Sequence, residues 1–325
     1  MPGKRPLLVT GGHVAGLWAL AVVQPLLDVV GRSPEFFAAH RAGPSDILLL
    51  LAMLLLLPPL LLMGLIAMAG VLGARVRSVV TATIITILVG LVAIQAMKQL
   101  GVARWTLAVP PALVAGAVTA VLYARLAGFR SYFTVLGAAV LIVPVAFAVQ
   151  PGIRRLIVPT TSRSAPADPA GKGFRPVPIV LMVFDELPLV SLLDADRAID
   201  PALYPNVAAL ARDGVWFRNA TTVSDYTRWA VPAILTGRRA RPDAVPTAAD
   251  HPDTLFSFFS RTHRLEVIEA ATAMCPRPLC VDPEDTLRRR FVAMTEDFSV
   301  VAAYVFLTPD LQERLELPDL TANWA

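Results

Sequence analysis

The chain contains 325 residues, of which 55% are hydrophobic and 17% are charged, and its mean hydropathy is +0.60. This apolar excess indicates a membrane protein rather than an average soluble domain. The formal net charge of +4 is small for this length, and no basic stripe alternates with aromatic residues. We therefore expect membrane lipids as partners and no nucleic acid.

Five apolar blocks occupy the first 155 residues or so. They are Leu7–Val30, Ile47–Gly73, Val79–Met97, Trp105–Tyr123 and Tyr132–Val149. Each is long enough to cross about 30 Å of hydrocarbon at about 1.5 Å per residue. A single such block could be a buried core helix, but five in succession with short connections favour membrane spans. The sequence thus predicts a transmembrane helical domain over residues 1–155.

Basic residues around these blocks favour a cytoplasmic N-terminus. The connections on that side contain Lys4, Arg5, Arg75, Arg77, Arg125 and Arg130, whereas those on the other side contain Arg32, Arg41, Lys98 and Arg104. This slight bias follows the positive-inside rule. With five spans, the residues after about 150 are then extracytoplasmic, although Arg154 and Arg155 oppose this orientation. We expect a multi-pass protein of the cell membrane.

Two ionisable residues lie within the first block. Such residues are functional candidates by default. Asp28 lies near the outer end of the block, where solvation costs little, and it is a candidate contact for a lipid headgroup or a partner. His13 is predicted to be a packed, neutral histidine.

The second half of the chain differs from the first in composition and in its predicted secondary structure. Residues 156–176 are rich in Pro, Ala, Ser and Gly and predict a linker, and residues 177–325 predict an α/β domain. Its expected strands are Ile179–Phe184, Val215–Val223 and Arg264–Ile268. Its expected helices are Pro205–Asp213, Thr227–Leu235, Leu255–Phe259 and one that starts at Asp282–Asp285. Phe298–Leu307 is apolar but too short to span, and we expect it to pack on the sheet or on the membrane surface.

Two short pieces of this domain contain the candidate chemistry. The apolar run Ile179–Phe184 is typical of a buried strand and stops at Asp185 and Glu186. In open α/β sheets, ligands bind at the carboxyl ends of the strands, and two adjacent acids there favour a divalent cation. Thr227 starts the predicted helix, where backbone amides and the helix dipole favour an anion.

These pieces resemble the alkaline phosphatase superfamily, and in particular its sulfatases and its membrane-bound phosphoethanolamine and lipoteichoic acid transferases. The resemblance covers about residues 178–238. A strand ends in two acids, then a helix with Pro205, Asn206, Leu210, Ala211 and Gly214 follows, and Leu235-Thr236-Gly237 lies downstream. Aligning that last motif places the nucleophile position of the family at Thr227. The layout of five spans before an extracytoplasmic domain is also similar to that of lipoteichoic acid synthases.

The resemblance implies a membrane-anchored metalloenzyme. Asp185, Glu186 and Thr227 would be metal ligands, and Thr227 would also be the catalytic nucleophile. The reaction would be phosphotransfer or phosphodiester hydrolysis on an anionic lipid or glycan phospho-ester of the cell envelope. Hard oxygen ligands admit Mg, Mn, Ca or Zn. Coordination would lower the pKa of the threonine hydroxyl and orient it.

The chain departs from the family pattern in several places. Val231 replaces the arginine that sulfatases carry four residues after the nucleophile, which leaves Arg228 as the candidate for substrate binding. Sulfatases modify a Cys or Ser at the nucleophile position, so Thr227 disfavours the alternative of a sulfuric ester hydrolase. Asp250-His251 lies in a loop rather than at a strand end, so the second half of the metal site is missing. The sulfatase-like domain is therefore expected to be incomplete, and a truncated or catalytically inactive protein is the second functional hypothesis.

The two cysteines, Cys275 and Cys280, lie in the sequence Cys-Pro-Arg-Pro-Leu-Cys. Outside the cell, a disulfide that closes this short loop is the natural expectation. Free thiols and a metal site are the alternatives, but no histidine lies at ligand spacing to support a metal.

Overall fold

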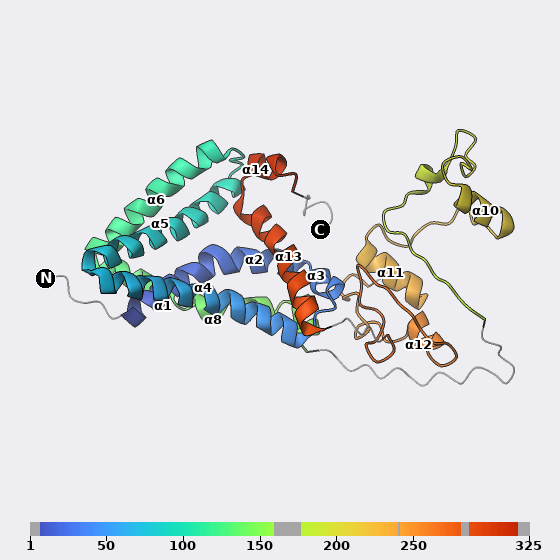
Figure 1. The fold of residues 1–325 in the computed structure, drawn as a ribbon, viewed down its shortest axis with the longest axis horizontal. Coiled ribbons are helices and arrows are strands. Elements are labelled where there is room, and N and C mark those ends of the chain that lie inside the picture. Colours follow the sequence, from blue (N-terminus) through green and yellow to red (C-terminus); the bar gives the residue numbers. More distant parts are fainter. Residues whose placement is uncertain (1–6, 159–176, 240, 281–285, 318–325) are drawn as a thin grey trace.

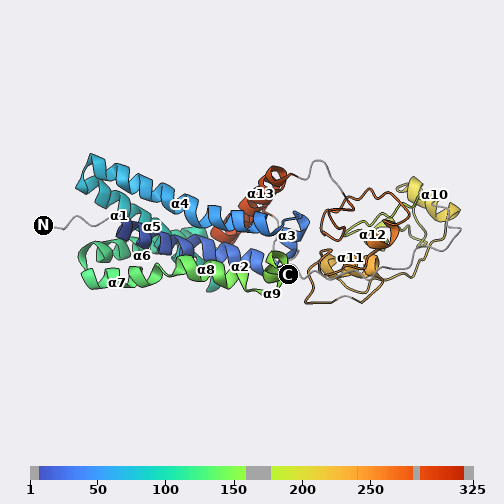
Figure 2. The same cartoon turned by 90° about the horizontal axis from the view of Figure 1, so that it is seen from below.

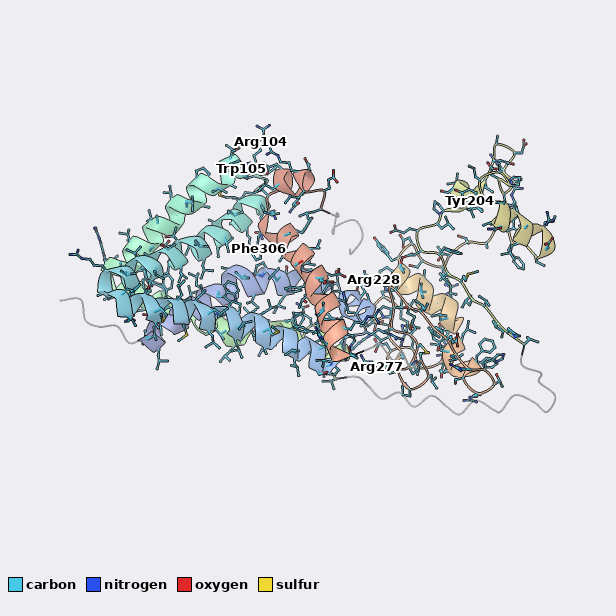
Figure 3. All side chains as sticks on the ribbon, in the orientation of Figure 1. Arg104, Trp105, Tyr204, Arg228, Arg277 and Phe306 are labelled. Atoms are coloured by element: carbon cyan, nitrogen blue, oxygen red, sulfur yellow. A yellow bond between two sulfur atoms is a disulfide. The ribbon has the colours of Figure 1, made fainter. Side chains whose placement is uncertain are left out.

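A computed structural model describes residues 7–158, 177–239, 241–280 and 286–317. Its N-terminal half is a bundle of long helices, residues 287–314 lie against this bundle, and residues 177–280 lie beyond one end of it (Figures 1, 2 and 3). The helix start expected at Asp282–Asp285 falls outside the described residues.

Five helical spans in the bundle are long and apolar enough to cross a membrane, as the sequence predicted. The first is continuous from Leu7 to Arg32 and comprises α1 (Leu7–Trp18), a π-helical turn η1 (Ala19–Val23) and α2 (Gln24–Arg32). The next three are α4 (Pro44–Leu72), α5 (Ala74–Gln99) and α6 (Trp105–Arg125). The fifth combines α7 (Ala127–Leu136) and α8 (Ala139–Ala148). Most backbone groups inside such a helix find their partners within the same segment, which is what an apolar solvent requires.

Small residues let the membrane helices approach closely. A Cβ atom added to Gly116 of α6 would lie 2.3 Å from the carbonyl oxygen of Thr86 on α5, so these two helices touch backbone to backbone there. Interfaces between membrane helices are typically built in this way. His13, in α1, packs as expected of a buried histidine, with Nδ1 2.9 Å from the Tyr123 hydroxyl and Nε2 3.0 Å from that of Thr134.

One end of the bundle, which we call the docking end, is formed by residues 33–43, 99–104 and 149–158. It contains two short helices, α3 (Glu35–Ala39) and α9 (Pro151–Ile157). The Asp28 carboxylate near this end pairs with Arg32, one helical turn away, at 2.8 Å. Asp28 is thus already paired within its own helix, and its predicted contact with a lipid or partner stays a prediction.

Helix α13 (Leu287–Phe306) spans the docking end and contacts α2, α4 and α5 (Figure 1). Its face of Met294, Phe298, Val301 and Val305 is buried. The sequence predicted only that Phe298–Leu307 would pack on a sheet or on the membrane surface. The segment is instead the second half of a longer helix that packs on the membrane helices, and α14 (Pro309–Arg314) follows it.

The remaining residues contain short helices joined by long loops. These are η2 (Leu189–Leu192, 3-10), α10 (Pro205–Asp213), α11 (Thr227–Thr236) and α12 (Leu255–Phe259). Helix α10 begins at Pro205 and ends before Gly214, as predicted, and α11 and α12 also begin where expected. We refer to residues 177–280 as the outer region.

The three expected strands are not formed within the described residues. Only two isolated bridges occur, Leu193 with Ile199 and Thr247 with Ala273. Residues 177–184 are extended but exposed, with Ile179 and Phe184 exposed at 52% and 68%. An apolar run becomes a strand only when a neighbouring strand accepts its backbone hydrogen bonds, and the described residues provide none. The structure therefore shows a helical membrane region, and the α/β domain stays a prediction.

Candidate functional site

The structure brings together two of the three residues predicted to form the site. The Thr227 hydroxyl donates a hydrogen bond of 2.8 Å to Asp185 Oδ1, across 42 residues of chain. Asp185 lies in the turn that ends the extended segment 177–184, and Thr227 is the first residue of α11. Asp185 is exposed and Thr227 is partly exposed, so a solute can reach the pair.

Local hydrogen bonds explain why Thr227 lies where it does. The Ser224 amide donates to Thr222 Oγ1, and the Tyr226 amide donates to Ser224 Oγ, which folds the residues before α11 into tight turns. The Tyr226 carbonyl then accepts the first bonds of the helix from Trp229 and Ala230. Thr227 thus occupies the first helical position, beside amides that no earlier turn can satisfy.

Glu186 adopts a left-handed backbone conformation with φ 54°. Such a conformation costs about 1 kcal/mol or more for a residue with a side chain and is often found at functional sites. Its side chain is exposed, and no contact joins it to Thr227 within the described residues. Of the three predicted site residues, Asp185 and Thr227 are thus joined by a hydrogen bond, and Glu186 is next to Asp185 in a strained backbone conformation.

Arg228 is committed to the membrane region rather than to the Asp185–Thr227 pair. Its Nη1 lies 3.1 Å from Glu35 Oε1 on α3, and its guanidinium stacks over the Trp229 ring at 4.5 Å. Burial raises the pKa of the Glu35 carboxyl above its ordinary value, although Arg228 opposes that shift. Desolvation thus outweighs the attraction at this junction. Substrate binding by Arg228 stays a prediction.

The Asp250-His251 pair belongs to a loop, as expected. Asp250 Oδ2 accepts a hydrogen bond of 2.8 Å from the Val245 amide and lies 3.3 Å from Arg155 Nη1 on α9. Its carboxylate therefore holds the loop to the docking end. The described residues contain no group of three or more His, Cys, Asp or Glu side chains that could hold a metal.

At the Asp185–Thr227 pair, a metal ion would therefore find only part of the ligands that it needs. The Asp185 carboxylate and the Thr227 hydroxyl are hard oxygen donors of the kind that Mg, Mn or Ca prefers, and Glu186 is adjacent in sequence. A six-coordinate ion would need further oxygens from solvent or substrate.

Glu269 organises the segment before the cysteines, which the sequence did not predict. Its carboxylate accepts hydrogen bonds from the Thr272 hydroxyl and from the amides of Met274 and Cys275, at 2.7–2.9 Å. Arg41 of the docking end lies 3.8 Å from the same carboxylate. Cys275 is paired with Cys280 in a disulfide, the pairing that the sequence favoured.

No protein-family model, no curated protein and no solved structure matches this chain. The resemblance to the alkaline phosphatase superfamily therefore depends on the residues quoted from the sequence alone.

Proposed function

We propose that this protein is a membrane-anchored phosphotransferase or phosphodiester hydrolase that acts on phospho-esters of the cell envelope, with Thr227 as the nucleophile. The observation that carries the proposal is the hydrogen bond of 2.8 Å between Thr227 and Asp185. It joins a nucleophile candidate to a group that can accept its proton, at the start of a helix. That arrangement suits attack on an anionic ester.

The proposal assigns distinct tasks to the chain's own residues. Asp185 orients the Thr227 hydroxyl and accepts its proton as the oxygen attacks phosphorus, and the bond from phosphorus to the ester oxygen breaks. The alcohol leaves with a proton, and water or an acceptor hydroxyl then attacks the phosphothreonine and frees Thr227. The first amides of α11 stabilise the negative charge on the phosphoryl oxygens. A divalent ion held by Asp185, Glu186 and Thr227 would lower the pKa of the hydroxyl and neutralise substrate charge.

The same proposal keeps the α/β assignment and the orientation predicted from the sequence. In support of it, the apolar run Ile179–Phe184 ends at Asp185 and Glu186, the sequence pattern of a sulfatase-like strand, although the run is not paired in a sheet within the described residues. The outer region would then lie outside the cell, close to the bilayer. There it would meet lipid-linked or glycan-linked substrates.

The experiment measures release of p-nitrophenol from a phosphodiester by the purified protein in detergent, with and without added Mg, Mn, Ca or Zn. We expect Thr227→Ala to lower the rate at least about 100-fold, because the attacking group is removed, and Thr227→Ser to retain part of it. Thr221→Ala is the matched control, because Thr221 is an exposed threonine in the same loop. Equal rates for the wild type and Thr227→Ala would refute the role of Thr227.

The second candidate function is a non-catalytic membrane protein in which Thr227 only supports the start of a helix. The lack of a third acidic or histidine ligand among the described residues favours this alternative. It predicts no turnover with any of the four metals. It also predicts that Thr227→Ala changes stability by about 1 kcal/mol, through loss of the hydrogen bond to Asp185, and nothing else.

A further inference from the structure

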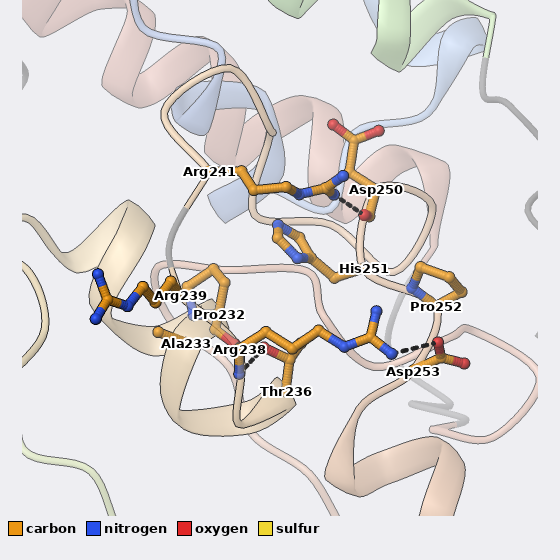
Figure 4. Close-up of a pocket in the computed structure, with 10 residues that line it drawn as sticks. All are labelled: Pro232, Ala233, Thr236, Arg238, Arg239, Arg241, Asp250, His251, Pro252 and Asp253. Atoms are coloured by element: carbon orange, nitrogen blue, oxygen red, sulfur yellow. Dashed lines mark hydrogen bonds and ion pairs between the residues drawn. The ribbon is translucent and has the colours of Figure 1, made fainter.

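A pocket of about 250 Å³ lies at the other end of α11 (Figure 4). It is formed by the last turn of that helix and by parts of the loop that follows, at residues 238–239, 241 and 250–253. The side chains that matter are Arg238, Arg241, His251 and Asp253, with Pro232 and Thr236 on the helix side. In Figure 4 the His251 ring lies between the side chains of Arg238 and Arg241.

The charges in this pocket favour an anion. Arg241 donates to the Asp250 backbone carbonyl, and no carboxylate forms an ion pair with it within the part of the chain that the structure describes. The Asp250 carboxylate is occupied by Arg155 and the Val245 amide. Asp253 lies 3.2 Å from Arg238 Nη2, and the Asp243 carboxylate interacts electrostatically with Arg241. Three arginines and two aspartates are among the residues that line the pocket, so positive charge exceeds negative charge in the lining.

The wall of the pocket is fixed to the docking end of the bundle. Arg155 of α9 binds Asp243 through both its backbone carbonyl and its carboxylate, the latter at 2.8 Å, and also binds Asp250. Helix α9 directly follows the fifth span, so this connection is short. The pocket therefore lies beside the end of the membrane helices.

We propose that this pocket is a binding site for a phosphate group, carried by either a lipid headgroup or a small soluble phospho-ester. Guanidinium groups match phosphate oxygens with paired N–H donors, and Arg238 and Arg241 line the same pocket on either side of His251. The site is separate from Thr227, because the ten residues of α11 place the two ends about 14 Å apart. It stands whether or not Thr227 is catalytic.

The first arm of the test uses soluble probes. The full-length protein is placed in nanodiscs of phosphatidylcholine and titrated calorimetrically with inorganic phosphate and with glycerol 3-phosphate. We expect Arg238→Gln to weaken binding by about fivefold or more, because one charge-assisted donor is lost. Arg238 is 72% exposed, so the variant should fold normally. Arg241→Gln should weaken binding by a similar factor.

Two neighbouring variants make the test specific. Asp253→Asn removes the carboxylate that pairs with Arg238 and should tighten binding by about threefold, an effect that damage to the fold would not produce. Arg239→Gln is the matched control, because it removes the same charge from the same loop, yet the Arg239 guanidinium points away from the others in Figure 4. It should change the affinity by less than about twofold.

The second arm identifies the source of the phosphate. Native mass spectrometry of the detergent-purified protein counts bound phosphatidylglycerol in the wild type and in Arg238→Gln. Lipid retention that depends on Arg238, without binding of the soluble probes, assigns the site to headgroups, and binding of the soluble probes assigns it to soluble phospho-esters. The proposal fails if the two soluble probes do not bind and the retention of phosphatidylglycerol does not depend on Arg238. It also fails if Arg239→Gln weakens binding as much as Arg238→Gln. Unchanged binding in Thr227→Ala would separate this site from the proposed catalysis.

Discussion

The membrane bundle and the outer region bury their apolar residues to very different extents. In the bundle, residues such as Phe36, Ile47 and Ile85 are at most 1% exposed and form one continuous core. In the outer region, α10 has no buried residue, and Val180 and Phe217 are more than three-quarters exposed. The bundle is thus held by its own packing, whereas the outer region has little core of its own.

The difference follows from what each kind of segment needs. A membrane helix satisfies its backbone hydrogen bonds internally, and lipid covers the apolar side chains that face outward. An extended segment such as Ile179–Phe184 satisfies neither requirement without a neighbouring strand. The outer region is instead tied to the docking end by polar contacts, namely Arg228–Glu35, Arg41–Glu269 and Arg155 with Asp243 and Asp250.

The largest effect on stability is expected from loss of the ion pair that holds helix α13 to the membrane bundle. Arg290 Nη2 lies 3.3–3.4 Å from both carboxylate oxygens of Asp46, which is fully buried at the start of α4. Removing one member of a buried ion pair leaves the other charge without compensation and costs about 3–5 kcal/mol. We expect Arg290→Ala to release α13 from the bundle, with faster hydrogen exchange along residues 287–306 and a lower thermal midpoint.

Arg288→Ala is the matched control for this prediction, because Arg288 is an exposed arginine two residues earlier on the same helix. Exchange in α13 that is equally fast in both variants, or unchanged in Arg290→Ala, would show that the apolar face of Met294 and Phe298 holds the helix by itself.

The sequence predicted the bundle well and the polar contacts hardly at all. The predicted blocks Leu7–Val30 and Trp105–Tyr123 match spans that end at Arg32 and Arg125. Long apolar runs can be identified locally, because the bilayer sets their length. Arg290 and Asp46 are 244 residues apart, so no local pattern reveals their contact.

In the candidate site, too, the sequence predicted local features but not contacts between distant residues. The sequence pointed to both Asp185 and Thr227, and the structure brings them into contact. It also suggested a strand before Asp185, because an apolar β-branched run predicts a strand regardless of whether a partner is present. Arg228 gave no local sign of its contact with Glu35, because that contact joins the outer region to a short helix between two spans.

Lys98 supports the other end of α13 and should have an intermediate effect. Its ammonium donates to the carbonyls of Tyr304, Val305 and Leu307 at 2.7–3.0 Å, at the end of a helix where carbonyl groups lack partners in the helix itself. The Gln312 side chain also donates to the carbonyls of Tyr304 and Leu307, so we expect the loss of Lys98 to cost about 1.5–3 kcal/mol in total rather than for each bond. We expect Lys98→Met to loosen the last turn of α13 and also α14.

Hydrogen exchange resolved by residue checks this prediction. The protection lost in Lys98→Met should concentrate in residues 303–314 and leave the Arg290 end of α13 unchanged. Lys98→Gln, which keeps two donors without the charge, should fall between wild type and Lys98→Met. Uniform loss along the whole helix would instead mean that α13 docks as one cooperative unit, and the distinction between its two ends would be lost.

The smallest expected effect is a pH dependence that belongs to the outer region alone. Burial and the nearby Arg241 lower the pKa of His251 below its ordinary value of 6.5, although Asp250 acts in the opposite direction. The unfolded chain therefore binds a proton more readily than the folded chain. The contribution of His251 to stability is present above about pH 6.5 and is lost as the pH falls through the lower, folded pKa.

Thermal unfolding followed between about pH 8 and about pH 5 tests this sign, and His251 is half-buried, so we expect less than about 1 kcal/mol. His251→Gln should flatten the acid side of the profile for the outer region and leave hydrogen exchange in the membrane spans unchanged. His263→Gln is the matched control, because that histidine lies in the outer region but away from the arginine pocket. An acid-side slope that survives in His251→Gln would assign the titration to another group, and a change in the spans would show that the two regions unfold together.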